Sequence, residues 1–198
     1  MIRLPRLADD SGYTLAEAVV SMVITAVFMG VSTTSILSLY SSANRAQAIA
    51  DAQQQLGIAF GRLDRQVRYA SGVSTPGVVN GEPYVEFLTT STGVPVCTQL
   101  RLRPSTGELQ QRTWVQGTGA LAPTPWTQLA NGVSATTPFT VTAADATHNF
   151  QRLGITLTAT AGGPARSTTR QFSATFTALN TTLTTSSTTA CAEGRGVS

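Results

Sequence analysis

The sequence has no lysine, a single histidine, two cysteines and few charged residues, which make up 12% of its 198 positions. Without lysine it has no G-x-x-x-x-G-K-[ST] nucleotide-binding loop, and its serines lie in neither a G-x-S-x-G nor an S-x-x-K motif. The single histidine, His148, excludes a multi-histidine metal site, and its polar context predicts a solvated loop residue. The acids are dispersed, without a pair typical of general acid–base catalysis. We therefore predict that the protein is not an enzyme and binds neither cofactor nor metal.

The basic residues are all arginine and are spread along the chain. Beyond Tyr40, 11 arginines stand against 7 acids, a net charge of +4. A surplus this small and scattered is no nucleic-acid footprint, so direct DNA binding is not indicated. The low charge and the abundance of Thr, Ser, Ala and Gly suit an exported surface protein better than a cytoplasmic enzyme.

The longest feature is an apolar run near the N-terminus. Residues 18–44 contain no charged side chain. A helix of about 20 residues spans the ~30 Å hydrocarbon core of a bilayer, so this run predicts one membrane-spanning helix. With the first 40 residues used for a leader and this helix, 158 remain, enough for one soluble domain.

A short motif precedes the apolar run. Gly12 is followed by the aromatic Tyr13, and Glu17 stands at the fifth position counted from Tyr13, in the string GYTLAE. This arrangement resembles the type IV prepilin family, in which a charged leader ends in Gly and the mature chain begins with an aromatic residue. A secretory signal peptide or an ordinary signal anchor would share the apolar run. The first would have a shorter one and an A-x-A-like cleavage site, and the second needs no acid at its start.

The resemblance implies specific processing and partners. A prepilin peptidase would cut between Gly12 and Tyr13 and N-methylate Tyr13, Glu17 would serve assembly, and the other partners would be pilin subunits, an assembly platform and its ATPase. The protein would be a single-pass membrane protein before assembly and a pilus or cell-surface component afterwards.

Two departures from the family pattern bear on different expectations. Asp9 and Asp10 offset the arginines of the leader, so the orientation of the helix rests on the resemblance and not on leader charge. The best-known major pilins carry a helix-kinking proline where this chain has Gly30 and a Ser/Thr cluster, and this departure favours a minor pilin or a pseudopilin. We expect a minor pilin. The alternatives are a pseudopilin of a DNA-uptake or type II-like secretion apparatus and a membrane-anchored binding module that never polymerises.

The helix is predicted to continue well beyond the membrane, because no proline occurs between Pro5 and Pro76. Apolar residues at helical spacing mark one face: Ile49, Leu56, Phe60, Leu63 and Val67. Asp64 and Arg68 stand at i and i+4, where they can form an ion pair. We expect one helix of roughly 55 residues that ends near residues 71–72, with Gly72 as a left-handed C-cap.

The remainder predicts β structure. Alternating patterns predict strands over residues 84–90, 96–103, 108–115, 139–142, 150–160 and 167–179, with a turn at 104–107 and a loop from 116 to 138. The fold class is α+β, a long N-terminal helix packed on a C-terminal antiparallel sheet, similar to the type IV pilin fold. We divide the chain into a leader (1–12), a membrane or filament-core helix (13–40), an amphipathic half (41–72), a β-sheet head (73–180) and a tail (181–198).

The tail is rich in Thr and Ser and cannot form a core of its own. It contains Cys191, and the other cysteine, Cys97, lies in a predicted strand. An even count in an exported domain predicts a disulfide, which would close a loop of 94 residues and stabilise the fold by about 4 to 5 kcal/mol. Two free thiols, or a bond between molecules, remain the alternatives.

Overall fold

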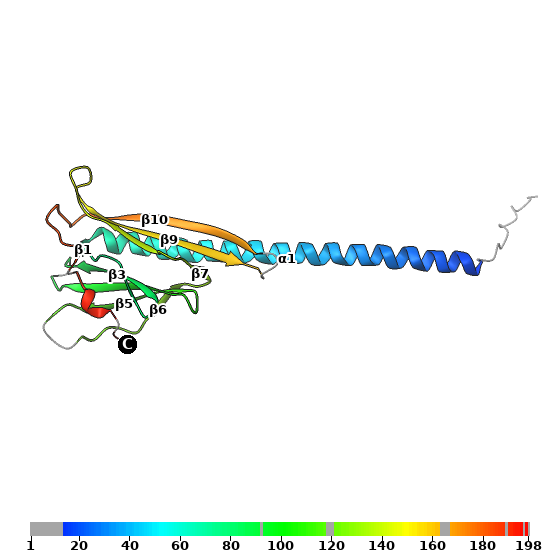
Figure 1. Ribbon diagram of the computed structural model, residues 1–198, viewed down its shortest axis with the longest axis horizontal. Coiled ribbons are helices and arrows are strands. Elements are labelled where there is room, and N and C mark those ends of the chain that lie inside the picture. The colour runs from blue at the N-terminus through cyan, green and yellow to red at the C-terminus, as the bar shows by residue number, and fades with distance from the viewer. Residues whose placement is uncertain are drawn as a thin grey trace, which may run out of the picture. The chain divides into compact units, whose positions relative to one another are not determined.

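The computed structural model describes residues 14–91, 93–117, 121–162, 167–188, 190–195 and 197. The chain divides into two compact units, residues 1–44 and 45–198. One helix, α1 (Leu15–Arg68), begins in the first unit and ends in the second, which holds all the strands (Figure 1). The predicted cleavage site, Gly12 and Tyr13, lies outside the described residues.

Helix α1 runs without interruption for 54 residues, as the absence of proline predicts. Its buried residues recur every three or four positions and form one face: Ile49, Ala52, Leu56, Ala59, Leu63 and Val67. This confirms the predicted apolar face. Phe60, at its border, packs edge-on against Phe176 with 5.8 Å between ring centroids. Asp64 and Arg68 form the predicted ion pair at 2.6 Å.

The predicted end of the helix is wrong. Helix α1 stops at Arg68, and Gly72 belongs to the strand β1 (Ala70–Val73) instead of capping the helix. The carbonyl of Arg68 accepts a hydrogen bond from the backbone of Leu179 (3.0 Å), and the carbonyl of Tyr69 accepts one from Asn180 Nδ2 (3.1 Å). Residues distant in sequence therefore donate hydrogen bonds to the backbone carbonyls where the helix ends, so no glycine C-cap is needed there.

The first sheet is antiparallel and contains β1, β2 (Gly77–Val79), β3 (Glu82–Thr89), β4 (Val96–Arg103), β5 (Glu108–Val115) and β6 (Thr127–Ala130). Its order is β1-β3-β4-β5-β6, and β2 pairs with β3. Strands β4 and β5 have the predicted bounds, and Gly107 closes their turn with φ of 66°. Between β2 and β3, Asn80 and Gly81 have φ of 54° and 79°, as a two-residue type I′ turn requires.

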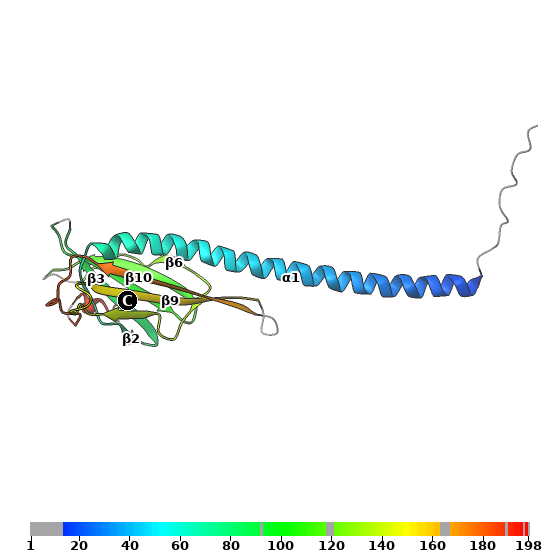
Figure 2. The ribbon, with the colours of Figure 1, turned by 90° about the horizontal axis from the view of Figure 1, so that it is seen from above.

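The second sheet contains β7 (Val133–Ser134), β8 (Phe139–Thr142), β9 (Gln151–Ala161) and β10 (Thr168–Ala178). Strand β9 pairs with β10, β7 and β8, all antiparallel. The hairpin of β9 and β10 extends along one side of the head (Figure 2), which confirms the predicted final hairpin, and β8 confirms the predicted short strand. Strands β6 and β7 lie in the segment predicted as a loop; with four and two residues they are too short to show an alternating pattern.

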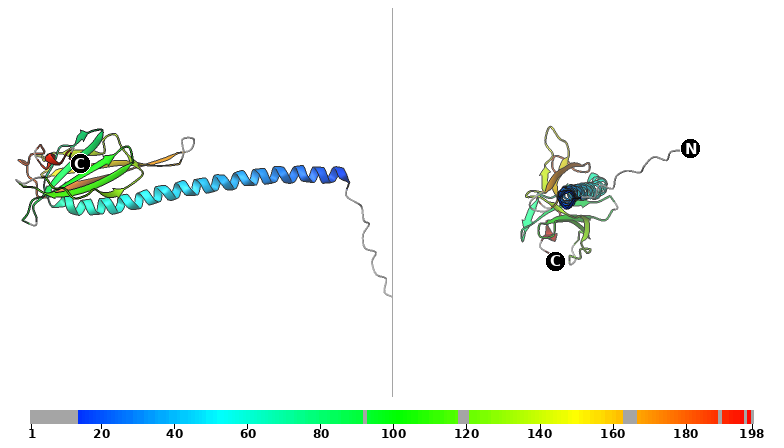
Figure 3. Two further views of the ribbon diagram at one scale, coloured as in Figure 1. Left: turned by 90° about the horizontal axis from the view of Figure 1, so that it is seen from below. Right: turned by 90° about the vertical axis from the view of Figure 1, so that its right-hand side faces the viewer.

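One core joins the second half of α1 to both sheets. Its fully buried members include residues of the helix (Leu56, Leu63, Val67), the first sheet (Val85, Phe87, Leu100, Leu102, Leu109) and the second sheet (Leu153, Ile155, Leu157). Seen end-on, the helix has strands of both sheets around it (Figure 3, right). The predicted α+β class, a long N-terminal helix packed on antiparallel β structure, is confirmed, with two sheets in place of one.

Candidate functional site

The first unit presents an apolar helical surface. From residue 15 to residue 48 of α1 no side chain is buried. The large apolar residues that are at least half exposed include Leu15, Val20, Met22, Ile24, Phe28, Met29, Val31, Ile36, Leu39 and Tyr40. By length and composition this helix could cross a membrane. An apolar surface of this extent marks contact with lipid or with protein.

Five hydroxyl groups of this surface donate to backbone carbonyls of the helix itself. Ser21, Thr25, Thr33 and Ser35 each donate to the carbonyl four residues earlier, at 2.8 to 2.9 Å. Thr34 donates to the carbonyl of Val31 at 2.9 Å. Hydrogen bonds within the segment are what a helix needs where no water is present, so these polar residues are compatible with a lipid or protein environment.

Glu17 belongs to a hydrogen-bonded box at the start of α1. Its Oε2 accepts from the backbone N–H and the hydroxyl of Thr14, both at 3.2 Å, and the Thr14 hydroxyl accepts from the N–H of Glu17 at 3.3 Å. This is the reciprocal capping box T-x-x-E, in which the N-cap residue and the third helical residue satisfy each other's backbone donors. Our sequence reasoning singled out Glu17 and missed Thr14, although the T-x-x-E spacing was visible.

The second unit carries the predicted disulfide. Cys97 in β4 and Cys191 after β10 are bonded, with 5.7 Å between their Cα atoms, and both are buried against Trp114 of β5. Cys191 belongs to a segment that we call the C-terminal strap, residues 190–195 and 197, which includes the short helix η1 (Ala192–Gly194). The two cysteines and Glu193 bring potential metal-ligand atoms within 4.8 Å of one another. Because the two sulfurs are bonded to each other, neither is available as a thiolate ligand.

The strap lies against a row of buried polar residues on the outer face of the first sheet. Glu86, Gln99 and Arg112 stand directly opposite one another on β3, β4 and β5. Gln99 Nε2 donates to Glu86 at 2.9 Å, and Arg112 Nε donates to Gln99 Oε1 at 2.8 Å. This face of the sheet is covered as well, because Glu86 and Gln99 have no exposed surface.

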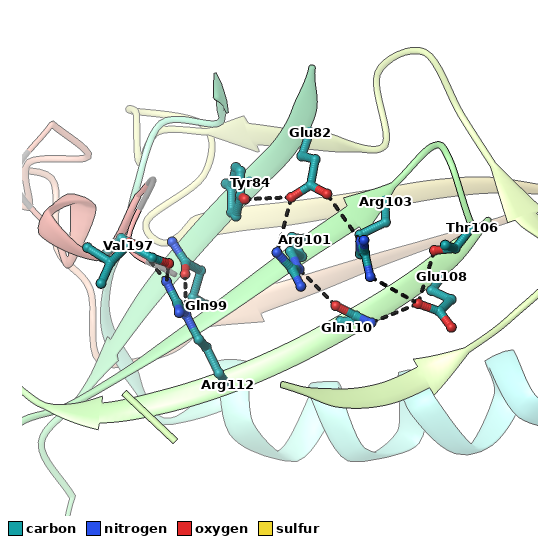
Figure 4. A network of polar contacts seen from close by, with 11 residues as sticks. Glu82, Tyr84, Gln99, Arg101, Arg103, Thr106, Glu108, Gln110, Arg112 and Val197 are labelled. Carbon is teal, nitrogen blue, oxygen red and sulfur yellow. Dashed lines mark hydrogen bonds and ion pairs between the residues drawn. The ribbon is translucent and has the colours of Figure 1, made fainter. Parts of the chain in front are cut away.

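The strap supplies the partners that this row needs. Arg195 Nη2 lies 2.6 Å from Glu86 Oε2 and also donates to the hydroxyl of Ser74. Arg112 Nη2 donates to two carbonyls of the strap, Gly194 at 2.7 Å and Val197 at 2.9 Å; Figure 4 shows the contact with Val197. Burial lowers the pKa of Arg112 from its usual value, and repulsion from the nearby positive charge of Arg101 lowers it further.

Next to this row the charged side chains are also paired. Glu82 contacts Arg101 at 3.1 Å and Arg103 at 3.3 Å (Figure 4). The guanidinium groups of Arg101 and Arg112 also lie over the Trp126 ring, at 3.9 and 4.2 Å from its centroid. These arginines are therefore engaged within the protein.

His148 lies in the loop before β9, half-buried. Its Nδ1 is 3.4 Å from Asp145 Oδ1, and its backbone N–H donates to the same oxygen at 2.6 Å. These contacts stabilise a local turn, in keeping with the predicted loop position.

The comparisons with known proteins give one structural match. No family model matches the chain, and no curated protein matches it. Among solved structures the chain is similar to a type IV-like pilin from Thermus thermophilus, with 10% identity and a TM-score of 0.46 over 65% of this chain and 97% of that one. Identity this low says nothing about function, so the function is argued below from residues and contacts.

Proposed function

We propose that the protein is a structural subunit, a minor pilin, of a type IV pilus or a related filament. It is held in the membrane by α1 until it is processed, and it then enters the filament through the same helix. The observation that carries this proposal is the apolar surface of residues 15–44, which is uncharged after Glu17 and buries none of its side chains within the chain. Such a surface requires lipid or neighbouring helices around it.

Three further features support the proposal. The Gly12, Tyr13 and Glu17 motif resembles the prepilin processing site. Five hydroxyls of the apolar helix donate to carbonyls of the same helix, which suits both a membrane and a filament core. The disulfide between Cys97 and Cys191 in the head suits an exported location, because disulfides persist in oxidising environments. The partners are then a prepilin peptidase, other pilin subunits, and an assembly platform with its ATPase.

Processing is tested by mass spectrometry of the N-terminus of the mature protein. We expect cleavage between Gly12 and Tyr13 and a methylated Tyr13 amine. A Gly12→Leu substitution should leave the leader attached, because a side chain there crowds the scissile bond, whereas Ser11→Leu, one residue earlier, is the matched control and should be cut. A protein that retains Met1, or whose mature chain begins near residue 41, would contradict the prepilin hypothesis.

Assembly is tested separately by shearing filaments from cells and comparing them with the membrane fraction. A filament subunit is recovered in the sheared fraction with its leader removed. A binding module that is only anchored remains wholly in the membrane fraction, and this result would favour that alternative.

A further inference from the structure

Strand β10 leaves one long edge of the second sheet open. It pairs with β9 over all 11 of its residues without a bulge, and in the part of the chain that the structure describes no other strand pairs with it. Apart from its bonds to β9, the only backbone group of β10 with a described partner is the carbonyl of Ala178, which accepts a hydrogen bond from Thr181. The rest of this edge therefore presents a row of unpaired N–H and C=O groups.

The other edges of the two sheets are short. Strands β1, β6 and β8 have four residues each, β2 has three and β7 has two. Register shifts also interrupt the pairing of β1 with β3 and of β6 with β5. Short strands and bulges are devices that keep an edge from pairing with another chain. Strand β10 has neither, contains no proline and carries one charge, Arg170. Among the described edges, that of β10 is therefore the one suited to accept a further strand.

The side chains of β10 indicate what an added strand would meet. Residues 168–171 are exposed, and beyond them the strand alternates. Phe172 and Ala174 are half-buried and pack against the core that includes α1, whereas Ser173 is exposed. Because side chains alternate across a strand, Arg170 lies on the same face as Phe172. An added strand would therefore place apolar side chains and the partner of Arg170 on one face, and polar side chains on the other.

The charge of the second sheet indicates the chemistry of the added strand. Its four strands contain two arginines, Arg152 and Arg170, and no acidic residue. Arg170 is exposed and Arg152 is half-buried, and the ion pairs in the described part of the chain involve other arginines. A carboxylate opposite Arg170 would complete an ion pair, whereas a second positive charge there would be repelled.

We propose that β10 pairs along its open edge with an extended, acidic segment of another polypeptide, which becomes the next strand of the second sheet. In this mode of recognition the main-chain hydrogen bonds supply affinity, and the alternating side chains supply specificity. The segment has a carboxylate opposite Arg170 and apolar side chains next to Phe172 and Ala174. Pairing of one head with one such segment needs neither the leader nor a filament, so this inference is independent of the proposed function.

The test uses the full chain in detergent and short synthetic peptides of alternating Thr and Val, in which one central Val is replaced by Glu or by Lys. Hydrogen exchange followed by mass spectrometry measures the protection of the amides in residues 168–178. We expect the Glu peptide to protect about half of these amides, those that do not bond β9, and to leave the amides of β9 unchanged. The same peptide with every amide N-methylated has no donors and should give no protection.

A charge reversal tests the chemistry of the partner. With the wild-type chain we expect the Glu peptide to bind about five-fold more tightly than the Lys peptide, the scale of one exposed ion pair. Arg170→Glu should invert this preference and keep the main-chain pairing. Arg62→Glu is the matched control, because Arg62 is an exposed arginine of α1 outside the second sheet. This variant should retain the preference for the Glu peptide.

Three results would overturn the proposal. The first is no protection of residues 168–178 by the Glu peptide, or equal protection by its N-methylated form. The second is equal affinity for the Glu and Lys peptides, which would mean that the edge does not select an acidic segment. The third is exchange in residues 168–178 that is slow without peptide and becomes faster on dilution, because a second copy of the chain would then occupy the edge.

Discussion

Glu17 has two separable properties, a negative charge and a hydrogen-bonding position in the box with Thr14. Three substitutions separate them. Glu17→Gln keeps a side chain that can accept from the Thr14 N–H but removes the charge, since glutamine also serves in capping boxes. Thr14→Ala removes the cap and keeps the charge. Glu17→Ala removes both.

The two properties differ in their energetic weight. The box has three hydrogen bonds at 3.2 to 3.3 Å, and loss of an N-cap residue costs about 1 kcal/mol, or roughly a five-fold change in an equilibrium. A carboxylate within hydrocarbon costs about 2.5 to 3.5 kcal/mol on insertion scales, so Glu17 requires a partner there. Removing one member of a buried ion pair costs about 3 to 5 kcal/mol, which is roughly a hundred-fold to a few thousand-fold change in an equilibrium.

If the charge of Glu17 pairs with the amine of a neighbouring subunit, as the prepilin resemblance implies, the variants fall into two groups. Glu17→Gln and Glu17→Ala should be inserted and cleaved normally but recovered in sheared filaments at levels lower by about a hundred-fold. Thr14→Ala should lower recovery by about five-fold or less. The measurement is quantitative immunoblotting of membrane and sheared fractions, with leader removal checked by mass spectrometry in each variant.

A different grouping would refute this reasoning. If Glu17→Gln behaved as wild type while Glu17→Ala matched Thr14→Ala, Glu17 would act only as a helix cap. Loss of cleavage in Glu17→Gln would instead place its role at the peptidase.

Three further predictions concern the head. Gly194→Ala should detach the strap from Trp114, because an added Cβ would overlap the Trp114 ring, and expose it to protease while the helix and leader cleavage remain unchanged, as limited proteolysis would show. Cys97→Ser should lower the free energy of unfolding by about 4 kcal/mol, measured in urea, because the loop of 94 residues is then no longer closed in the unfolded chain. Burial raises the pKa of Tyr84 above its usual value, and the hydrogen bond to Glu82 raises it further. The stability that the neutral phenol contributes is therefore present below pH ~10, and it is lost as the pH rises through the pKa of Tyr84 in the folded protein. A Tyr84→Phe difference titration at the phenolate absorbance should show this late ionisation.

The long helix and the longer strands could be predicted from sequence because their signals are local. The proline-free run specifies one continuous helix, and the apolar spacing of Leu56, Leu63 and Val67 gives its buried face. Strands β4 and β5 alternate over eight residues each, which is long enough to give their bounds. Strand β2 also had a usable signal, since Asn80-Gly81 is a strong predictor of a two-residue hairpin.

The helix end and the strap could not be predicted in the same way, because distant residues decide them. The carbonyl of Arg68 is satisfied by Leu179, more than a hundred positions later. The composition of the tail correctly indicates that it has no core of its own, but composition does not reveal that Glu86 and Trp114 form a surface into which Arg195 and Gly194 fit. The alternation of polar and apolar residues along the strands places these side chains on the solvent side of the sheet. They are nevertheless buried, by a strap whose own sequence has no helical or strand periodicity.

The two units therefore differ in what they require from their surroundings. In the second unit the buried Glu86 and the partly buried Glu82 face arginines of the same chain, and the two cysteines are bonded to each other, so these groups need no partner outside the chain. The apolar surface of residues 15–44 has no such cover within the chain. If the chain enters a filament as proposed, hydrophobic burial would drive its association through this helix, and specificity would arise where a charge must be matched, at Glu17. It follows that conservative apolar substitutions along the helix should be tolerated, while the loss of one carboxylate at its start should not.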